Sequence, residues 1–342
     1  MKSILVFRFS SLGDVAMTYP VLKTLTETHP EIKIQLVSRP FFAPIFKHLP
    51  KIEFIPASVD TTYKGLPGLY KLFKDLKTGN LDLVADLHDV LRTKVLRNFF
   101  RLTGTPVYVI DKGRKEKKHL VRTPLEHNRP LKSTHERYTD VFRKAGFPLD
   151  LSLFKPEKPL LDSPVKLFLA PFFKTKLIGV APLAKHPGKQ YPLGGTKEAI
   201  RLILEENRDA VVFLFGSPDE KPILDSIIPD PHRVFNLAGM FSFAEELQII
   251  SRLDIMLSMD SGNGHLAANY GIPVITVWGI THPYAGFAPF GQTPDRQILP
   301  DIKKFPMLPC SIYGNKICPG YEKIWDDILP EYIAEKVLTN LS

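Results

Sequence analysis

The sequence predicts an α/β protein with two Rossmann-like, doubly wound domains. Short apolar strands alternate with amphipathic helices in the first half of the chain, and the same alternation returns in the second half. This alternation is typical of parallel sheets joined by right-handed crossovers. At 342 residues, the chain is also longer than one hydrophobic core usually supports.

The first half contains five apolar runs that predict strands and four segments with helical periodicity. Pro20 lies inside the first helical segment, and Gly79 is placed to end the second. The expected strands cover residues 3–9, 33–38, 52–57, 81–87 and 106–110, and the expected helices cover residues 15–30, 66–79, a segment from 91, and 138–147.

The alternation is interrupted by residues 112–137, which hold nine Lys or Arg against three Glu and include two Pro. A Pro-rich stretch without a steady period follows and reads as a linker. We therefore expect an N-terminal domain at residues 1–150, a linker at 151–165 and a C-terminal domain at 166–342. The final helix of the chain is a candidate for packing back on the N-terminal domain.

The second half repeats the pattern of the first. Ser242 and Glu245 form a capping-box pattern at the start of one helix. The expected strands cover residues 176–182, 210–216, 233–239, 254–259 and 272–279, and the expected helices cover 196–207, 219–228, 242–253, 264–271 and 331–341.

The composition points to an anionic partner and a reducing compartment. The net charge of +9 suits nucleic acid, a membrane surface or a phosphorylated ligand, without choosing among them. Two cysteines, Cys310 and Cys318, predict no disulfide framework and a cytosolic setting. The N-terminus does not read as a signal peptide, and no apolar run approaches the ~20 residues of a membrane span.

The turn after the first strand raises a question, because it carries a carboxylate. Ser10, Ser11, Gly13 and Asp14 stand between that strand and the first helix, where α/β proteins often bind a phosphate. A phosphate would avoid Asp14. The alternative to a functional role is that Asp14 caps the helix.

The stretch "MDSGNGHLAANYG" forms a second turn of this kind, between a strand and a helix that starts near His265. Gly262 and Gly264 would let the backbone approach a ligand, and the helix N-terminus offers unpaired amides to an anion. The segment therefore predicts a diphosphate site. An ordinary capped turn is the alternative.

Taken together, the two turns resemble those of the ADP-heptose:lipopolysaccharide heptosyltransferases, glycosyltransferase family 9. The family opens with a strand, an Arg and an S-x-G-D turn, and later carries D-[ST]-G-x-x-H-[LA]-A-A, G-x-P and G-x-T-x-P. The matching residues are Arg8, Ser10, Ser11, Leu12, Gly13, Asp14, Asp260, Ser261, Gly262, His265, Leu266, Ala267, Ala268, Gly271, Pro273, Gly279, Thr281 and Pro283.

This resemblance implies a GT-B fold, with two Rossmann-like domains facing across a cleft. The acceptor would bind the N-terminal domain and the nucleotide sugar the C-terminal domain, which removes the conflict between Asp14 and a phosphate. Asp14 would then act as the general base that takes a proton from the acceptor hydroxyl during inverting transfer.

The resemblance also implies a set of donor-binding residues. Lys189 would neutralise the diphosphate leaving group and so share the catalytic role. Lys185 departs from the family, which often has Thr or Ser near that position. Glu220 lies near the ribose in related proteins, although it could instead complement a helix dipole. The expected nucleotide-sugar site comprises Lys185, Lys189, Glu220, Met240, Asp260, Ser261, Gly262 and His265.

The acceptor site is expected on the N-terminal domain. The basic segment 112–137 reads either as a solvated loop or as a clamp for an anionic glycolipid, and we expect it to be mobile and too polar to join a core. The candidate residues are Ser10, Ser11, Gly13, His88, Arg92, Lys115, Lys117 and Lys118. No metal is expected, because Asp86, His88 and Asp89 fit an acceptor loop better than a metal site.

The resemblance therefore implies a cofactor-independent, inverting glycosyltransferase. It would move heptose from ADP-heptose to a Kdo-lipid A type inner-core acceptor, as a monomer on the inner face of the cytoplasmic membrane. One alternative is another nucleotide sugar or acceptor on the same scaffold. The other is a basic protein that binds nucleic acid or an anionic surface, although no nucleic-acid module is recognised and no nucleic-acid partner is expected.

Overall fold

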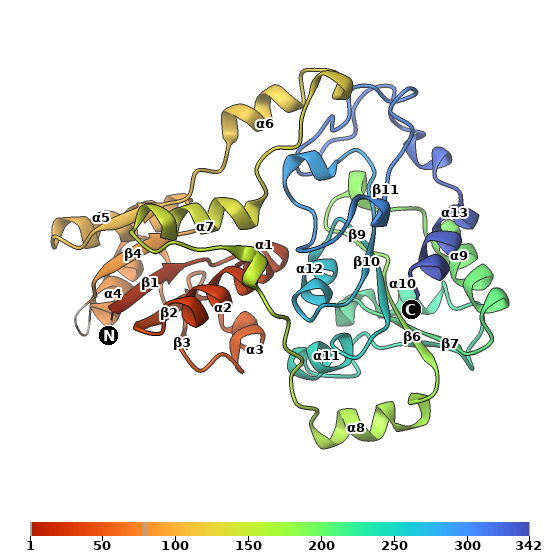
Figure 1. Ribbon diagram of the computed structural model, residues 1–342, viewed down its shortest axis with the longest axis horizontal. Coiled ribbons are helices and arrows are strands. Elements are labelled where there is room, and N and C mark those ends of the chain that lie inside the picture. The colour runs from red at the N-terminus through yellow and green to blue at the C-terminus, as the bar shows by residue number, and fades with distance from the viewer. Residues whose placement is uncertain (1, 78, 80, 342) are drawn as a thin grey trace. The chain divides into compact units, whose positions relative to one another are not determined.

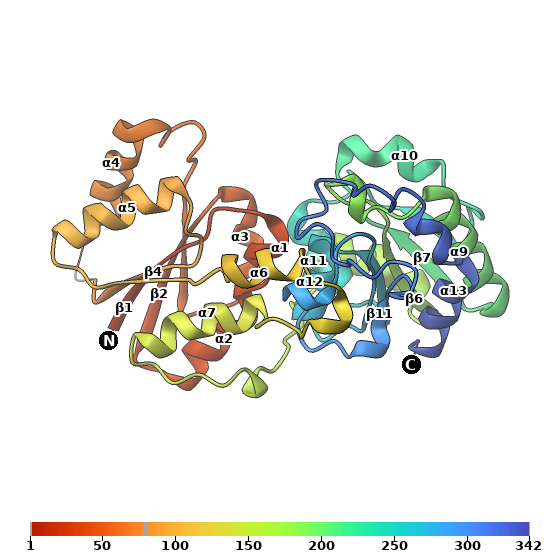
Figure 2. The same ribbon diagram turned by 90° about the horizontal axis from the view of Figure 1, so that it is seen from above.

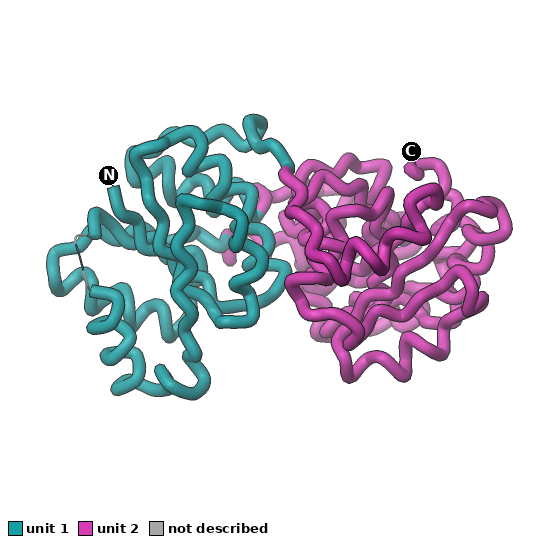
Figure 3. Tube along the Cα trace, turned by 90° about the horizontal axis from the view of Figure 1, so that it is seen from below, with its two compact units in different colours: residues 1–112, 134–156 teal, residues 113–133, 157–342 magenta. Residues whose placement is uncertain are grey.

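The computed structural model describes residues 2–77, 79 and 81–341, and the chain forms two compact units (Figure 3). Unit 1 comprises residues 1–112 and 134–156, and unit 2 comprises residues 113–133 and 157–342. The main division lies inside the predicted linker. Residues 113–133 of the basic segment, however, group with unit 2, whereas the sequence interpretation put the whole segment in the N-terminal domain.

Unit 1 is built on a five-stranded parallel sheet with the order β3-β2-β1-β4-β5 (Figure 1). All five predicted strands are present. Their bounds are β1 Lys2–Phe7, β2 Ile32–Ser38, β3 Ile52–Pro56, β4 Leu83–Asp86 and β5 Val107–Val109.

The helices of unit 1 cover both faces of this sheet, with α4 and α5 on one face and α2 and α7 on the other (Figure 2). The helix expected over residues 15–30 is divided at Met17, and Pro20 is tolerated because it lies in the first turn of α2. The helices are α1 Leu12–Ala16, α2 Thr18–Thr28, α3 Ala43–Phe46, α4 Gly65–Leu76, α5 Leu91–Leu102 and α7 Thr134–Lys144.

Unit 2 is built on a six-stranded parallel sheet with the order β11-β10-β9-β6-β7-β8. The five predicted strands are confirmed. A sixth strand was missed, because its two residues are too few to show an alternation of apolar and polar side chains. The bounds are β6 Lys176–Ala181, β7 Ala210–Leu214, β8 Val234–Asn236, β9 Ile255–Met259, β10 Val274–Val277 and β11 Gln297–Ile298.

The last helix of unit 2 packs on α9, and its Ile333 and Val337 join the core of this unit. It is therefore part of the core of unit 2. The helices are α6 Arg114–Leu120, α8 Ser163–Leu169, α9 Leu193–Glu206, α10 Lys221–Asp225, α11 Phe243–Ile250, α12 Gly262–Asn269 and α13 Pro330–Thr339.

Short 3-10 turns complete the structure. They are η1 Pro40–Phe42, η2 Leu125–His127, η3 Leu151–Leu153, η4 Ala170–Phe172, η5 Pro187–Lys189, η6 Pro218–Glu220, η7 Pro283–Ala285, η8 Pro294–Arg296 and η9 Ile324–Asp327. No helix within residues 2–77, 79 and 81–341 has both the length and the apolar character needed to cross a membrane.

Both sheets follow the doubly wound order, in which the strand order reverses next to the first strand of the domain. In unit 1 the reversal lies between β1 and β4, and in unit 2 it lies between β6 and β9. Ligands of such sheets bind outside the carboxyl ends of the strands at this point. The topology therefore directs attention to the loops after these four strands.

The basic segment contributes to the core of unit 2, which corrects the expectation that it is too polar to do so. Leu125 packs with Ile280, Leu308 and Ile324 in one buried cluster. The backbone N–H of Leu125 also donates to the Pro306 carbonyl at 2.7 Å. Apolar residues spaced between the lysines thus anchor the segment.

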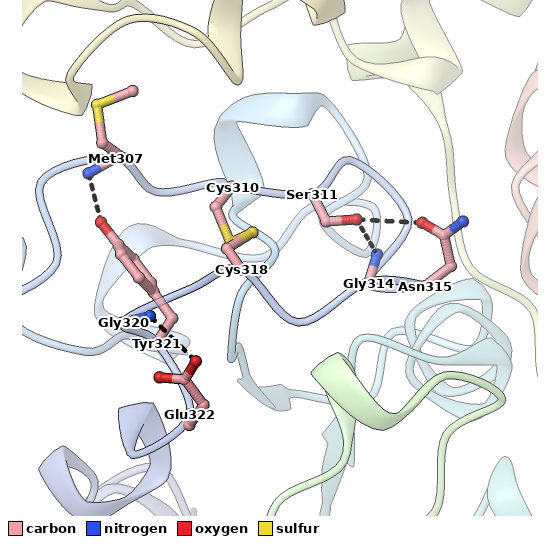
Figure 4. The surroundings of a disulfide bond; sticks show 9 residues. All are labelled: Met307, Cys310, Ser311, Gly314, Asn315, Cys318, Gly320, Tyr321 and Glu322. Atoms are coloured by element: carbon pink, nitrogen blue, oxygen red, sulfur yellow. Dashed lines mark hydrogen bonds between the residues drawn. A yellow bond between two sulfur atoms is a disulfide. The ribbon is translucent and has the colours of Figure 1, made fainter.

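A disulfide joins Cys310 to Cys318 (Figure 4), so the expectation of no disulfide is wrong. The bridge closes a nine-residue loop in the C-terminal part of unit 2. Two cysteines alone could not indicate this pairing, because their contact depends on the path of the loop between them. The surrounding loop is held by Ser311, Asn315 and Tyr321 (Figure 4).

Candidate functional site

Asp14 lies in the first turn of α1, the helix that follows the loop after β1. The Ser11 hydroxyl donates to Asp14 Oδ2 at 2.8 Å, and the Ser11 backbone N–H approaches the same oxygen at 3.4 Å. Ser11 is the N-cap of α1, so Asp14 does take part in the local cap of this helix. Its side chain nevertheless keeps 28% of its surface exposed.

A buried arginine fixes the same carboxylate. Arg8 Nη2 lies 2.6 Å from Asp14 Oδ2, and Arg8 Nη1 donates to the Leu87 carbonyl at 2.9 Å. Arg8 therefore ties the loop after β1 to the loop after β4. The permanently charged guanidinium thus faces the Asp14 carboxylate and orients it.

Tyr138, on α7, supports this loop and is a residue that sequence reasoning missed. Its hydroxyl donates to the Asp14 carbonyl at 3.2 Å, and its ring lies 5.8 Å from the Arg8 guanidinium carbon. Burial raises the pKa of the Tyr138 phenol, so the group remains a neutral hydrogen-bond donor. No local motif signals Tyr138, because 124 residues separate it from Asp14.

His88 lies at the reversal point of the unit 1 sheet, in the loop after β4. Its Nδ1 accepts from the Phe9 backbone N–H at 3.4 Å, an orientation that puts the proton of the neutral ring on Nε2. Burial, and then the charges of Arg8 and Lys112, lower the pKa of His88 to about 3. His88 is therefore uncharged at neutral pH.

Arg92 lies in the first turn of α5 and shares a carboxylate with a second arginine. Its guanidinium is 2.7 Å from Asp60, whose other oxygen is 2.6 Å from Arg39. The three side chains are between 39% and 52% exposed. Two arginines on one carboxylate leave the cluster with a net charge of +1. Asp60 and Arg39 were not predicted as site residues, because neither belongs to a recognisable sequence motif.

The acidic residues near His88 form ion pairs with Arg97, which argues against a metal site made of Asp86, His88 and Asp89. Arg97 Nη1 lies 2.9 Å from Asp86 and 3.0 Å from Asp89. The part of the chain that the structure describes contains no group of three His, Cys, Asp or Glu side chains arranged to hold a metal ion.

In unit 2, Lys189 and Asp260 meet at the corresponding reversal point. Lys189 ends η5 in the loop after β6, and Asp260 follows β9 directly. Their Nζ and Oδ2 atoms are 2.8 Å apart, and both side chains are largely buried, with 15% and 5% of their surface exposed. The structure therefore brings together two residues that the sequence assigned to the same site.

The N-terminus of α12 lies beside this pair. Ser261 is the N-cap, and its hydroxyl oxygen is buried without a hydrogen-bond partner among the described residues. Gly262 opens the helix, and His265 is buried in its first turn. The first amides of such a helix have no partner within it and suit an anion.

Gly264 has a packing role, which the sequence interpretation did not include. A Cβ atom at this position would lie 2.6 Å from Ser258 Oγ and 3.3 Å from Val274 Cγ1. Glycine thus lets α12 approach β9 and β10 closely. Ala267 and Ala268, both buried, extend the same small-residue face.

The remaining donor candidates lie on the loops after β7 and β8. Glu220 ends η6, and its carboxylate accepts from the Ser217 backbone N–H at 2.6 Å, as a helix cap does. Met240 is 55% exposed beyond β8. Gly239 lies against Pro218, which brings these two loops together. Lys185 is exposed in the turn before η5.

The three candidate lysines of the basic segment differ in their surroundings. Lys115 and Lys118 are exposed on α6. Lys117 is 7% exposed, and its ammonium lies 4.1 Å from the centre of the Phe287 ring, in unit 2. Lys117 is therefore packed against other side chains, whereas the sequence suggested a solvent-exposed lysine.

Comparison with known proteins gives one consistent result. Residues 69–294 match the model of glycosyltransferase family 9 (heptosyltransferase). The lipopolysaccharide core heptosyltransferase OpsX of Haemophilus influenzae is 23% identical over 287 residues, which are 82% of this chain and 80% of that protein.

Solved structures show the same fold. A glycosyltransferase family 9 structure from Veillonella parvula is 17% identical and superposes with a TM-score of 0.75 over 99% of this chain and 97% of that one. The E. coli heptosyltransferase WaaC, solved with ADP-2-deoxy-2-fluoro heptose, is 20% identical and has a TM-score of 0.67, with 99% of both chains covered. The chain thus has the GT-B fold of these heptosyltransferases.

Proposed function

Because the chain belongs to glycosyltransferase family 9, we propose that this glycosyltransferase moves heptose from ADP-heptose to a lipopolysaccharide inner-core acceptor, with inversion at the sugar. The names of its relatives support heptose transfer in lipopolysaccharide synthesis. The ADP-heptose analogue in the WaaC structure supports the choice of donor.

The observation that carries the proposal is the buried Lys189–Asp260 pair beside the start of α12. A nucleoside diphosphate would meet three suitable groups there: the Lys189 ammonium, the first amides of α12 and the unpartnered Ser261 hydroxyl. When the sugar–phosphate bond breaks, negative charge grows on the departing diphosphate, and these groups stabilise it.

Asp14 supplies the other half of the proposed chemistry. Its carboxylate takes the proton of the acceptor hydroxyl as that oxygen forms a bond to the anomeric carbon. The bond from this carbon to the diphosphate breaks at the same time, and ADP leaves with the electron pair. The Arg8 ion pair holds the carboxylate in place for this role.

The acceptor side is proposed to use the loops of unit 1. His88, neutral and near Arg8, can hydrogen-bond to sugar hydroxyls without attracting or repelling a charge. The surplus positive charge of the Arg39–Asp60–Arg92 cluster suits phosphates or acidic sugars. The proposed place of action is the inner face of the cytoplasmic membrane, where an anionic glycolipid would attract a chain of net charge +9.

The test uses purified protein with ADP-heptose, GDP-mannose or UDP-glucose, and with Kdo-lipid A or a heptose-extended core as acceptor. Mass spectrometry of the acceptor should show one added heptose with ADP-heptose alone. Transfer from another donor would keep the enzyme class and replace the proposed sugar. No transfer, together with thermal stabilisation by a DNA oligomer that is lost at high salt, would favour a nucleic-acid binding protein.

A further inference from the structure

We propose that Gly314, in the loop closed by the Cys310–Cys318 disulfide, is a positioning residue that holds the Lys189 ammonium at the donor site. Breaking the disulfide would then weaken the binding of the donor diphosphate. The inference rests on the proposed function, because it takes Lys189 to contact that diphosphate.

Gly314 lies directly on the aliphatic part of Lys189. A Cβ atom at position 314 would be 2.5 Å from Lys189 Cγ, too close unless one of the two shifts, and 3.2 Å from Cε, a tight contact. Gly314 has a φ of +69°, which also favours glycine. Its carbonyl oxygen accepts from the Gly188 backbone N–H at 3.2 Å. The loop thus contacts both the backbone and the side chain of the η5 turn.

The η5 turn is held from its other side by the end of β10. The Ile280 backbone N–H donates to the Gly188 carbonyl at 3.1 Å, and the Ile280 carbonyl accepts from the Cys310 backbone N–H at 3.1 Å. The first cysteine of the disulfide is therefore attached to the same residue that holds the η5 turn. Cys310 also packs against the buried cluster that contains Ile280.

Two hydrogen bonds of Ser311 order the loop between the cysteines. The Ser311 hydroxyl accepts from the Gly314 backbone N–H at 3.1 Å and donates to the Asn315 side-chain oxygen at 3.2 Å (Figure 4). The disulfide closes the loop around these two bonds. Without it, the segment after Ser311 gains conformational freedom, and Gly314 loses its fixed place against Lys189.

The consequence for the site follows from the length of the lysine side chain. Lysine has a flexible four-carbon stem, and fixing it costs conformational entropy. In this structure the stem lies against Gly314 while the ammonium reaches Asp260 at 2.8 Å. Because the loop already holds the Lys189 stem in place, the side chain loses less conformational entropy when a diphosphate binds.

The experiment measures the dissociation constants of ADP and AMP by calorimetry for the oxidised full-length chain and its variants. Gly314→Ala should raise the ADP constant about tenfold, the lower end of what a hydrogen bond to a charged group contributes, and leave AMP almost unchanged. Gly291→Ala is the matched control, because Gly291 has the same φ of +69° and nothing within 4 Å of a Cβ atom. It should bind both nucleotides like wild type.

A double variant separates positioning from general damage. If Gly314 acts through Lys189, then Lys189→Ala with Gly314→Ala should bind ADP no more weakly than Lys189→Ala alone. Additive losses would overturn the inference. If Lys189→Ala itself shows no ADP-selective loss, the assignment of Lys189 in the proposed function fails first.

Reduction of the wild-type protein gives a second readout that needs no substitution in the site. A phosphine reductant should weaken ADP binding selectively, and reoxidation should restore it. Cys310→Ser with Cys318→Ser should behave like the reduced protein and be insensitive to the reductant. Normal ADP binding by reduced wild type, with Lys189→Ala impaired, would contradict the inference and leave the proposed function intact.

Discussion

Lys189 Nζ and Asp260 Oδ2 are 2.8 Å apart, although the two residues follow different strands of the unit 2 sheet. Both side chains are largely withdrawn from water, so neither charge would be stable there without the other. Asp260 therefore orients the lysine, and the diphosphate is proposed to bind a lysine that is already in place.

Replacement of Lys189 should weaken the binding of ADP more than the binding of AMP. Lys189→Ala should weaken ADP binding by about 10- to 100-fold and AMP binding much less, because the ammonium is proposed to meet the diphosphate. Calorimetric titration with both nucleotides measures the difference. Lys185→Ala, a change at an exposed position in the same loop, serves as the control and should have a smaller effect. Equal losses for ADP and AMP would remove Lys189 from the diphosphate site.

The general position of both sites could be predicted from the sequence. The alternation of strands and helices indicated two doubly wound sheets, and in such sheets ligands bind at the carboxyl ends of the strands. Asp14, His88, Lys189 and Asp260 lie in the segments that follow β1, β4, β6 and β9, so strand order places them near the two reversal points. That order is itself restricted by the right-handed crossover rule.

The basic segment should affect the acceptor more than the donor. Lys115→Gln with Lys118→Gln should weaken acceptor use and make turnover less sensitive to salt, while ADP affinity stays unchanged. Both residues are exposed and can meet an anionic glycolipid. Steady-state kinetics at two salt concentrations provide the measurement. Loss of ADP binding with normal acceptor kinetics would place the segment on the donor side.

Lys117 should behave differently from its two neighbours. Its ammonium lies over the Phe287 ring, so Lys117→Gln should lower the unfolding free energy by about 0.5–2 kcal/mol, the range of such cation–π contacts. Urea denaturation of this variant beside Lys118→Gln tests the difference. Equal stability of the two variants would show that the contact contributes nothing measurable.

His88 should make the stability of the protein depend on pH. The folded state resists protonation of His88 until about pH 3, whereas the unfolded chain takes up the proton near 6.5. Between these values the unfolded state binds more protons, so stability falls as the pH drops below 6.5. From pH 7 to pH 5, His88 should account for a loss of about 2 kcal/mol.

His88→Asn keeps an acceptor for the Phe9 N–H and should remove most of this dependence. Urea denaturation at pH 7 and pH 5 provides the comparison, with the exposed His127→Asn as the control. An unchanged slope in His88→Asn would show that His88 is protonated as easily in the folded protein as in the unfolded chain.

Substitution of two neighbouring glutamates on α11 should have opposite effects on the stability of the protein. Burial raises the pKa of Glu246 to about 7, so the folded protein holds the proton more tightly than the unfolded chain, and stability falls as the pH rises from 4.5 to 7. Glu246→Gln should therefore stabilise the protein at pH 8 by about 1–2 kcal/mol, allowing for its partial exposure.

The neighbouring Glu245 accepts hydrogen bonds from Ser242 at the start of α11, so Glu245→Gln should destabilise the protein. Thermal denaturation compares the two variants, and a stabilised Glu245→Gln would contradict this account.

Contacts between distant segments could not be predicted from the sequence. The bond from Tyr138 to the Asp14 carbonyl, the ring of Phe287 under Lys117 and the contact of Gly314 with Lys189 each join residues more than 100 positions apart. No periodicity or motif links them, because each depends on how a loop returns to the sheet. The apolar residues of the basic segment, such as Leu125, were hidden among charges for the same reason.

The most direct test of the account is the turnover of Asp14→Asn, measured with ADP-heptose and a Kdo-lipid A acceptor beside its ADP affinity. The asparagine keeps the size of the side chain and can still accept from Ser11, but it cannot take a proton. We predict a loss of about 10²- to 10⁴-fold in turnover with unchanged ADP binding, while Ser11→Ala loses far less. Near wild-type turnover in Asp14→Asn would contradict the account and leave Asp14 as a helix cap.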